Sequence, residues 1–230
     1  MSQKQVEIDY YTDMLCVWAY FGQVKVDELK RQFGERIRID YKFIPLFGNN
    51  AVRIGHGWEA GGFAGYSRHV RELASHFPHV SVHRRIWMEQ APASSLPVHL
   101  TLKAVQLLER GDRLRPAEPG APTPLEALAW RLRCAFFRDL ENIADRQVIH
   151  RHLRQLEIPV DAVEEAIANG EAYAEMALDI EEQRSRMIEG SPTFLMNEGR
   201  QRLYGNVGYL AIEANVRELL ERKLDVPDWC

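Results

Sequence analysis

Alternating apolar and polar positions mark the first elements of the chain. In residues 5–11 every second residue is apolar or aromatic, a pattern typical of a strand. After Cys16 the apolar spacing becomes helical and continues until Gly34, which predicts an amphipathic helix closed by glycine. Residues 37–47 alternate again until Pro45 ends the run. We therefore expect a β-α-β unit with parallel strands and a right-handed crossover.

The middle of the chain has almost entirely helical spacing. Residues 49–65 are glycine-rich without a clear period, so we interpret them as a loop. Asp145 and Asp161 are candidate helix caps, and a break is expected near Gly170. The predicted helices span residues 65–77, 97–110, 124–139, 145–156 and 160–186.

The strand pattern returns near the end of the chain. Residues 192–197 and 201–205 predict a hairpin around a turn at 198–200, followed by an amphipathic helix to about Leu224. The order β-α-β, helical block, β-β-α predicts an α/β protein with a thioredoxin fold, a four-stranded mixed sheet and an inserted α-helical domain. The expected domains are residues 1–48 with 187–230, thioredoxin-like, and residues 49–186, helical.

Composition and charge make some classes of function unexpected, among them nucleic-acid binding. Among the 230 residues, 46% are hydrophobic and 27% charged, which is ordinary for a soluble globular protein. The 29 basic and 33 acidic residues give a net charge of −4, so nucleic acid is not an expected partner. No run of 18 apolar residues and no signal-peptide pattern is present, so we expect no membrane association and a cytoplasmic location.

Cys16 is the candidate nucleophile. It falls where the first strand leads into a helix, and unpaired N–H groups and the helix dipole at such a position favour a thiolate. A lowered thiol pKa would make the cysteine reactive. The simpler alternative is a buried, inert cysteine. Cys134 lies on an apolar helix stripe and is expected in the core, whereas the terminal Cys230 leaves a resolving role open.

Pro192 begins the third predicted strand. An X-Pro bond is the one kind for which the cis form costs little, so Ser191-Pro192 is a candidate cis peptide that presents its backbone to an extended, thiol-bearing partner. A trans proline that starts a strand is the alternative.

These residues carry a resemblance to a known family. Asp13-Met14-Leu15-Cys16-Val17-Trp18-Ala19-Tyr20-Phe21-Gly22 resembles the motif D-x-x-C-P-W-C-Y-x-G, and Gly190-Ser191-Pro192-Thr193-Phe194 resembles G-[VS]-P-[TS]-F. Both motifs belong to DsbA-type thioredoxin-fold oxidoreductases, in particular the FrnE-like branch. The likeness covers essentially the whole chain and implies a substrate site formed by Trp18, Ser191, Pro192 and Thr193 around catalytic Cys16.

The sequence departs from this pattern at two positions. Val17 replaces proline, and Ala19 replaces the second cysteine that normally resolves a mixed disulfide. We therefore expect a thiol-disulfide oxidoreductase that acts through Cys16 alone, with an external thiol such as glutathione as co-substrate and no tightly bound cofactor. The alternatives are a glutathione-dependent transferase or isomerase of a small hydrophobic substrate, related to 2-hydroxychromene-2-carboxylate isomerases and kappa-class glutathione transferases, and a non-catalytic binding module.

The remaining candidates have supporting roles. Asp13 is interpreted as a helix cap or as support for the site, and Trp18 as a site wall or a core aromatic. Ser94 and Ser95 precede a helix start and are most simply caps, with a substrate contact as the alternative. No metal site is predicted. The expected partner is a thiol-containing small molecule or protein, and a homodimer is an option that the sequence leaves open.

Overall fold

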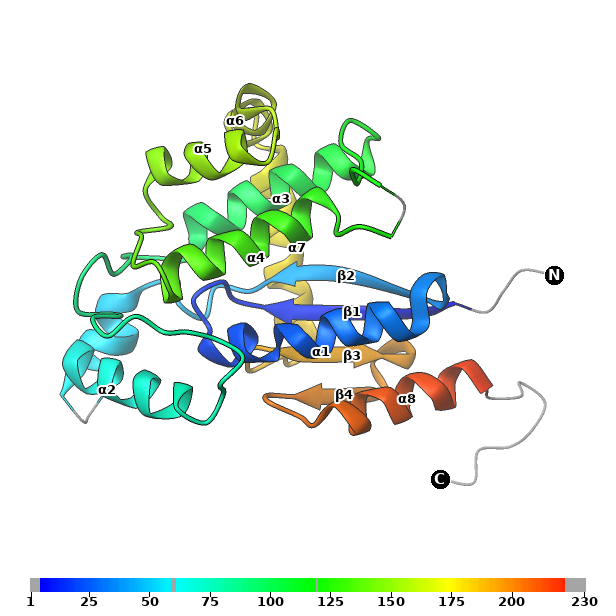
Figure 1. Cartoon of the computed structure of the whole chain (residues 1–230). Coiled ribbons are helices and arrows are strands. Elements are labelled where there is room, and N and C mark those ends of the chain that lie inside the picture. The colour runs from blue at the N-terminus through cyan, green and yellow to red at the C-terminus, as the bar shows by residue number, and fades with distance from the viewer. Residues whose placement is uncertain (1–4, 59–60, 119, 222–230) are drawn as a thin grey trace.

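A four-stranded sheet in the order β2-β1-β3-β4 lies at the centre of the protein (Figure 1). The structure is a computed structural model that describes residues 5–58, 61–118 and 120–221. The strands are β1 (Val6–Thr12), β2 (Ile37–Phe43), β3 (Thr193–Met196) and β4 (Gln201–Tyr204). Strand β2 runs parallel to β1, and β3 runs antiparallel to both β1 and β4. The predicted mixed sheet and thioredoxin fold are confirmed.

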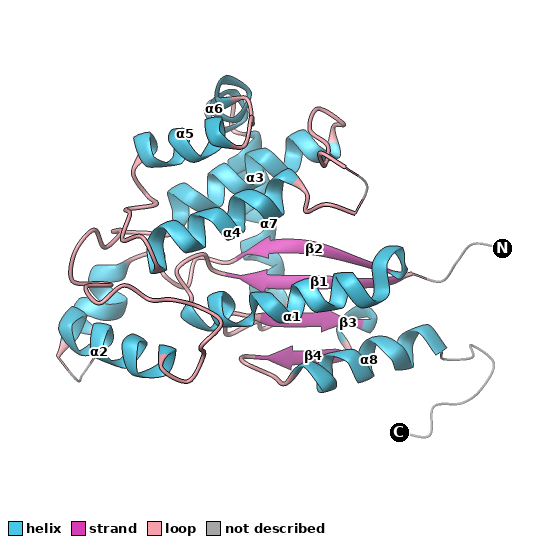
Figure 2. Ribbon diagram, in the orientation of Figure 1, coloured by secondary structure: helices cyan, strands magenta, loops and turns pink. Residues whose placement is uncertain are grey.

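Two helices cover one face of the sheet. Helix α1 (Val17–Phe33) connects β1 to β2, and helix α8 (Tyr209–Glu221) follows β4 (Figure 2). Both present an apolar side to the core, where Val26 and Leu29 of α1 are fully buried. Gly34 ends α1 with a φ of 53°, a conformation that glycine adopts without steric cost. The predicted end of the last helix at Leu224 lies outside the described residues.

The segment between β2 and β3 is helical, as its periodicity predicts. Helices α3 and α4 lie beside the β2 edge, whereas α2 lies apart from them, next to the end of the sheet where β1 and β2 finish (Figure 1). The helices are α2 (Gly62–Ala74), α3 (Leu96–Arg110), α4 (Pro124–Phe137), α5 (Arg146–Gln155), α6 (Val160–Ala168) and α7 (Glu171–Ser185).

Local details of this segment differ from expectation at two places. Part of the predicted loop 49–65 is helical, because Ala51–His56 forms a π-helical turn and α2 begins at Gly62. Six residues are too few to show an apolar period. Asp145 caps α5 by accepting a hydrogen bond from the N–H of Gln147, but Asp161 caps nothing, since α6 begins one residue earlier after Pro159. The break at Gly170 is confirmed between α6 and α7.

A buried ion pair joins the helical segment to the sheet. Lys103 Nζ of α3 lies 2.7 Å from Asp179 Oδ2 of α7, and the same oxygen accepts the N–H of Phe43 in β2 at 2.8 Å. Burial raises the pKa of the Asp179 carboxyl, and the Lys103 charge offsets part of that effect. Because an unpaired buried charge is costly, this contact ties three elements to one another.

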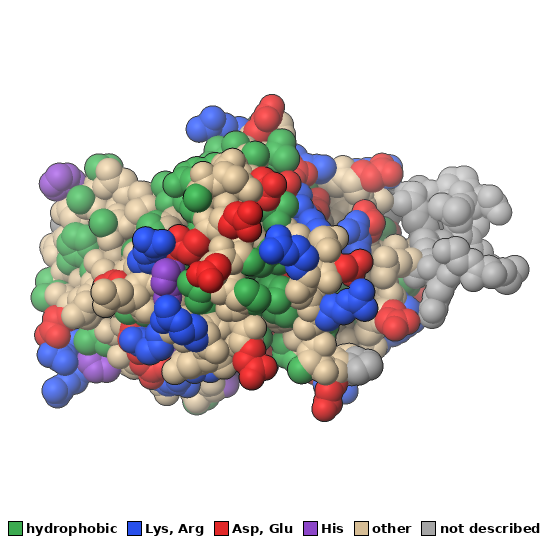
Figure 3. All heavy atoms as spheres, turned by 90° about the horizontal axis from the view of Figure 1, so that it is seen from above, with side chains coloured by type: hydrophobic (Ala, Val, Ile, Leu, Met, Phe, Trp, Pro, Cys, Tyr) green, Lys and Arg blue, Asp and Glu red, His purple; other side chains and the backbone are tan. Residues whose placement is uncertain are grey.

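The surface carries charges of both signs. On the face shown in Figure 3, Lys and Arg side chains are interspersed with Asp and Glu side chains. Within the described residues, no helix is long and apolar enough to cross a lipid bilayer.

Candidate active site

Cys16 lies where β1 passes into α1. It is the N-cap residue of α1, with extended backbone angles, and its carbonyl accepts the first helical hydrogen bond from the N–H of Tyr20. Its side chain is only 5% exposed. The parallel strands β1 and β2 both end on this side of the sheet, so the cysteine sits at the edge where loops from several elements meet.

The loop before β3 reaches the sulfur from the other side. Cys16 Sγ donates a hydrogen bond to the carbonyl oxygen of Ser191 at 3.1 Å, and Ser191 Oγ accepts the N–H of Asp13 at 3.0 Å. The Ser191-Pro192 peptide bond is cis. The two sequence motifs, 175 residues apart, therefore meet at one point.

The state of the thiol differs from the expectation. Burial raises the pKa of the Cys16 thiol, and the nearby Asp13 charge acts in the same direction. Hydrogen bonds from Ser191 and from the backbone N–H groups of Ala19 and Trp18 lower the pKa by less. The predicted lowering of the pKa by the helix N-terminus is therefore wrong, because burial outweighs it. The thiol is neutral near pH 7 and acts as a hydrogen-bond donor.

Asp13 is not a helix cap. The N-cap of α1 is Cys16, and no side chain caps that helix. The fully buried Asp13 carboxylate instead accepts hydrogen bonds from the N–H of Leu15 at 2.8 Å, the N–H of Phe47 at 2.9 Å and the hydroxyl of Ser95 at 2.9 Å. Burial raises the pKa of Asp13, but the hydrogen bonds that its carboxylate accepts hold the pKa below its ordinary value, so the carboxyl stays ionised.

The serines before α3 have separate roles. Ser95 occupies the N-cap position of α3 without a side-chain cap bond, because its hydroxyl is committed to Asp13. Ser94 Oγ accepts the N–H of Leu96 instead. His99, one turn into α3, was not identified from the sequence. The sequence feature that could have identified it is a histidine among the apolar residues of a predicted helix.

A cavity of about 350 Å³ opens beside Cys16. Trp18 and Ser191 line it, as the sequence predicts, together with Phe47. Pro192 and Thr193 are buried and are not among its lining residues, and the Thr193 hydroxyl donates to the carbonyl of Gly190 at 2.8 Å. The structure therefore does not place these two predicted substrate-binding residues on the wall of this cavity.

The opposite wall comes from the 51–69 region. Trp58 packs edge-on against Tyr66 at a ring distance of 4.9 Å, and the Arg53 guanidinium lies 4.6 Å from the centre of the Phe47 ring. Arg53, Trp58, Tyr66 and His69 all line the cavity. None of them was identified from the sequence, because their segment was interpreted as a loop and the start of the predicted helix 65–77.

Tyr204 closes the side of the cavity next to β4. Its ring lies directly over Gly190, where an added Cβ would be 2.1 Å from the ring carbon Cε2. Tyr204 is 63% exposed and yet lines the cavity. Glycine at position 190 is what allows this close approach.

The described residues place no second thiol at the site. Ala19 is fully buried in the first turn of α1, three residues after Cys16. Cys134, buried on α4 as predicted, is a free cysteine like Cys16. The candidate Cys230 lies outside the described residues. Within those residues no group of His, Cys, Asp and Glu could hold a metal ion.

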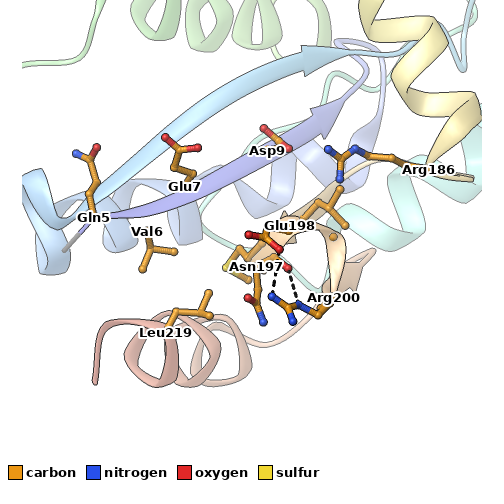
Figure 4. Close-up of a pocket in the computed structure, with 12 residues that line it drawn as sticks. Gln5, Val6, Glu7, Asp9, Arg186, Asn197, Glu198, Arg200 and Leu219 are labelled. Atoms are coloured by element: carbon orange, nitrogen blue, oxygen red, sulfur yellow. Dashed lines mark hydrogen bonds and ion pairs between the residues drawn. The ribbon is translucent and has the colours of Figure 1, made fainter. Parts of the chain in front are cut away.

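A second cavity, of about 600 Å³, lies at the opposite end of the sheet (Figure 4). It is formed by the beginning of β1, the turn after β3 and one side of α8. Two of its charged groups pair with neighbours: Arg200 with Glu198, and Glu7 with Arg38. It contains no thiol, so the Cys16 cavity is the better candidate for chemistry.

Comparison with known proteins identifies the family to which most of the chain is similar. The family model described as "DSBA-like thioredoxin domain" matches residues 7–216. Among curated proteins no match is found.

Several solved structures share the fold. A probable DsbA oxidoreductase from Streptomyces coelicolor is 16% identical, with a TM-score of 0.71, covering 98% of this chain and 95% of its own. The cytosolic disulfide reductase DsbM from Pseudomonas aeruginosa, also solved with GSH, is 18% identical, with a TM-score of 0.64 and coverage of 92% and 98%. A 2-hydroxychromene-2-carboxylate isomerase is 14% identical, with a TM-score of 0.62 and coverage of 93% and 95%. At these identities the likeness concerns the fold.

Proposed function

This chain belongs to the DSBA-like thioredoxin domain family, and we propose that it is a thiol-disulfide exchange enzyme that works through Cys16 alone, with glutathione as co-substrate. One observation carries the proposal. The Cys16 sulfur lies 3.1 Å from the Ser191 carbonyl beside a cavity, while position 19, where a resolving thiol would stand, is alanine.

The proposed reaction is two successive exchanges. Cys16 loses its proton to solvent and its sulfur attacks the glutathionyl sulfur of a mixed disulfide, so that the substrate thiolate leaves and takes up a proton. The thiolate of a second glutathione then attacks the same glutathionyl sulfur on Cys16. Oxidised glutathione leaves and Cys16 is a thiol again. The substrate sulfur is reduced to a thiol and one free glutathione is oxidised, because the other half of the oxidised glutathione was already part of the mixed disulfide. Electrons therefore balance without a second protein thiol.

The cavity wall suits this co-substrate. Glutathione carries two carboxylates, and Arg53 is a cation on the wall for which the described residues provide no carboxylate partner. The backbone beside Ser191 offers an edge to an extended peptide. The same proposal includes a cytosolic location, in line with the description of DsbM as cytosolic, because glutathione is the main thiol of that compartment.

Substitution of the cysteine tests the proposal. A peptide that carries a glutathione mixed disulfide is incubated with protein and excess glutathione, and released peptide thiol is measured by chromatography. Cys16→Ser should lower the enzyme-dependent rate at least about a hundredfold, because a hydroxyl cannot replace the thiolate in exchange. Cys134→Ala, which alters a buried cysteine on α4, should keep the wild-type rate.

Two outcomes would count against this function. Full activity of Cys16→Ser would exclude Cys16 as the nucleophile. A Cys16 thiol that never exchanges, in a protein that still retains a stable binding partner, would support the non-catalytic binding module instead.

The aromatic wall favours one second candidate. Trp18, Phe47, Trp58 and Tyr66 surround the thiol with apolar rings, and a neutral Cys16 can donate a hydrogen bond to a bound glutathione sulfur. This arrangement suits a glutathione-dependent isomerase or transferase of a small hydrophobic molecule. Phe21, five residues after Cys16 on α1, stacks on Phe77 and does not line the cavity. Saturable binding of a hydrophobic ligand only when glutathione is present would favour this candidate.

A further inference from the structure

We propose that Asp13, Ser95 and His99 are positioning residues for Cys16, holding its turn so that the sulfur stays at the Ser191 carbonyl. The effect of these residues on catalysis rests on the proposed function, whereas their effect on the position of Cys16 rests on the contacts described below. The inference extends that function by assigning roles to Ser95, the N-cap residue of α3, and to His99 within α3, a helix that contributes nothing to the cavity wall.

The Asp13 carboxylate joins three separate segments. It accepts a hydrogen bond from Leu15 within its own turn, from Phe47 after β2 and from Ser95 at the start of α3. All three contacts are 2.8–2.9 Å long, and both Asp13 and Ser95 are fully buried. A buried carboxylate needs such donors, and the positive end of the α3 dipole also favours it. The carboxylate therefore fixes the turn relative to β2 and α3.

His99 holds the next residue of the turn. Its Nε2 accepts the N–H of Met14 at 3.1 Å and lies 3.6 Å from Asp13 Oδ1. The ring is fully buried and packs 5.5 Å from the Phe43 ring. Ser95 and His99 are four residues apart, so they lie on the same face of α3 and contact adjacent residues of one turn.

The backbone of the turn transmits this restraint to the sulfur. The N–H of Cys16 donates to the carbonyl of Asp13 at 3.1 Å, and the N–H of Asp13 donates to Ser191 Oγ at 3.0 Å. Hydrogen bonds therefore hold the N–H, the carbonyl and the carboxylate of Asp13. Asp13 lies between Cys16 and Ser191, whose carbonyl accepts the hydrogen bond from the Cys16 thiol. Displacement of Asp13 would move Cys16 and Ser191 relative to each other.

The charge of Asp13 affects the pKa of the Cys16 thiol, an effect that a purely structural role in packing would not have. The negative charge of Asp13 raises the pKa of the Cys16 thiol, in addition to the larger effect of burial. Removal of that charge should lower the thiol pKa. The substitution leaves the other titratable or charged side chains around the site in place. They are Tyr10 of β1, His99 beside Asp13, and Arg53, Tyr66, His69, Glu189 and Tyr204 on the cavity wall.

The test is the pH profile of Cys16 alkylation in the full-length protein. Iodoacetamide rates are measured across pH, and the alkylated cysteine is identified by peptide mass. Asp13→Asn should shift the midpoint to lower pH and speed alkylation near neutral pH about threefold to tenfold, since a lower thiol pKa raises the thiolate fraction. Ser95→Ala keeps the charge, so its midpoint should stay, while glutathione-dependent exchange falls.

Ser94→Ala is the matched control, since it also removes one hydroxyl hydrogen bond at the start of α3. It should leave both alkylation and exchange unchanged. An unshifted midpoint in folded Asp13→Asn, or equal losses of exchange in the two serine variants, would overturn the inference. A shifted midpoint in a protein without exchange activity would keep the positioning role and reject the proposed function.

Discussion

At the scale of single residues, the surroundings of the Cys16 sulfur set its reactivity. The backbone N–H groups at the start of α1 and the Ser191 side chain favour the thiolate, but burial and the Asp13 charge oppose it and prevail. When the pKa of a thiol is raised, only a small fraction is thiolate near neutral pH, but that thiolate is a strong nucleophile. The rate of exchange should therefore rise as the pH rises toward the thiol pKa.

Position 19 tests the single-thiol interpretation. Ala19 lies three residues after Cys16 on α1, and its backbone N–H contributes a hydrogen bond that lowers the Cys16 pKa. In Ala19→Cys, the introduced thiol should form a disulfide with Cys16 under mild oxidation, because residues three apart on a helix are neighbours. Peptide mapping after alkylation should then find both thiols protected.

The serine variant Ala19→Ser is the control, similar in size but without a thiol. It should keep a free Cys16 after the same oxidation. If both thiols of Ala19→Cys remained free, the sulfur of Cys16 would not face position 19, and the loss of a resolving thiol would not explain this site.

The functional residues that could be predicted are those whose position follows from the order of strands and helices along the chain. Cys16 and Ser191 follow from their places before a helix and before a strand, and the structure brings them together. Arg53, Tyr66 and His99 were missed, because their contacts depend on how distant helices pack. The thiol pKa was predicted in the wrong direction for the same reason, since burial is not visible in the local sequence.

At the scale of elements, the contact between α3, α7 and β2 rests on the buried Lys103–Asp179 pair. In Lys103→Met, Asp179 keeps the N–H of Phe43 but loses its cation, so the free energy of unfolding should fall by about 3 kcal/mol. Burial already raises the pKa of Asp179, and the loss of Lys103 raises it further. The folded state then binds a proton more tightly than the unfolded state, so the deficit should shrink as the pH falls through that raised pKa.

Chemical denaturation at several pH values measures this effect. The double variant Lys103→Met with Asp179→Asn is the control, because the amide oxygen can still accept the Phe43 N–H without a buried charge. It should recover part of the lost stability. A deficit that is the same at every pH would show that lost packing, rather than an unpaired carboxylate, causes it.

Most elements were predictable because their apolar periods are long. Helices α3 and α4 and strand β1 agree with the predicted ranges within one or two residues at each end. The π-helical turn at Ala51–His56 was not predictable, since its six residues are too few to show an apolar period. It nevertheless supplies Arg53 and Ile54 to the cavity.

At the scale of the whole molecule, the two parts of the thioredoxin-type sheet and the helical segment meet at one end. Figure 1 shows α2 and the loops around it next to the end of the sheet where β1 and β2 finish. The β1–α1 junction provides the thiol, the loop before β3 provides its hydrogen-bond acceptor, and residues 51–69 provide the opposite wall. The order of elements predicted this meeting of the two motifs, but not the wall.

The central claim is that Cys16 alone accepts a glutathionyl group and releases it to glutathione. The most direct measurement is the intact mass and peptide map of the wild-type protein after incubation with oxidised glutathione, before and after reduced glutathione is added. We predict one glutathionyl group on Cys16, formed faster at alkaline than at neutral pH and removed by reduced glutathione, with Cys134 unmodified. An unmodified Cys16 in the folded protein at every pH, or an adduct that reduced glutathione does not release, would contradict the account.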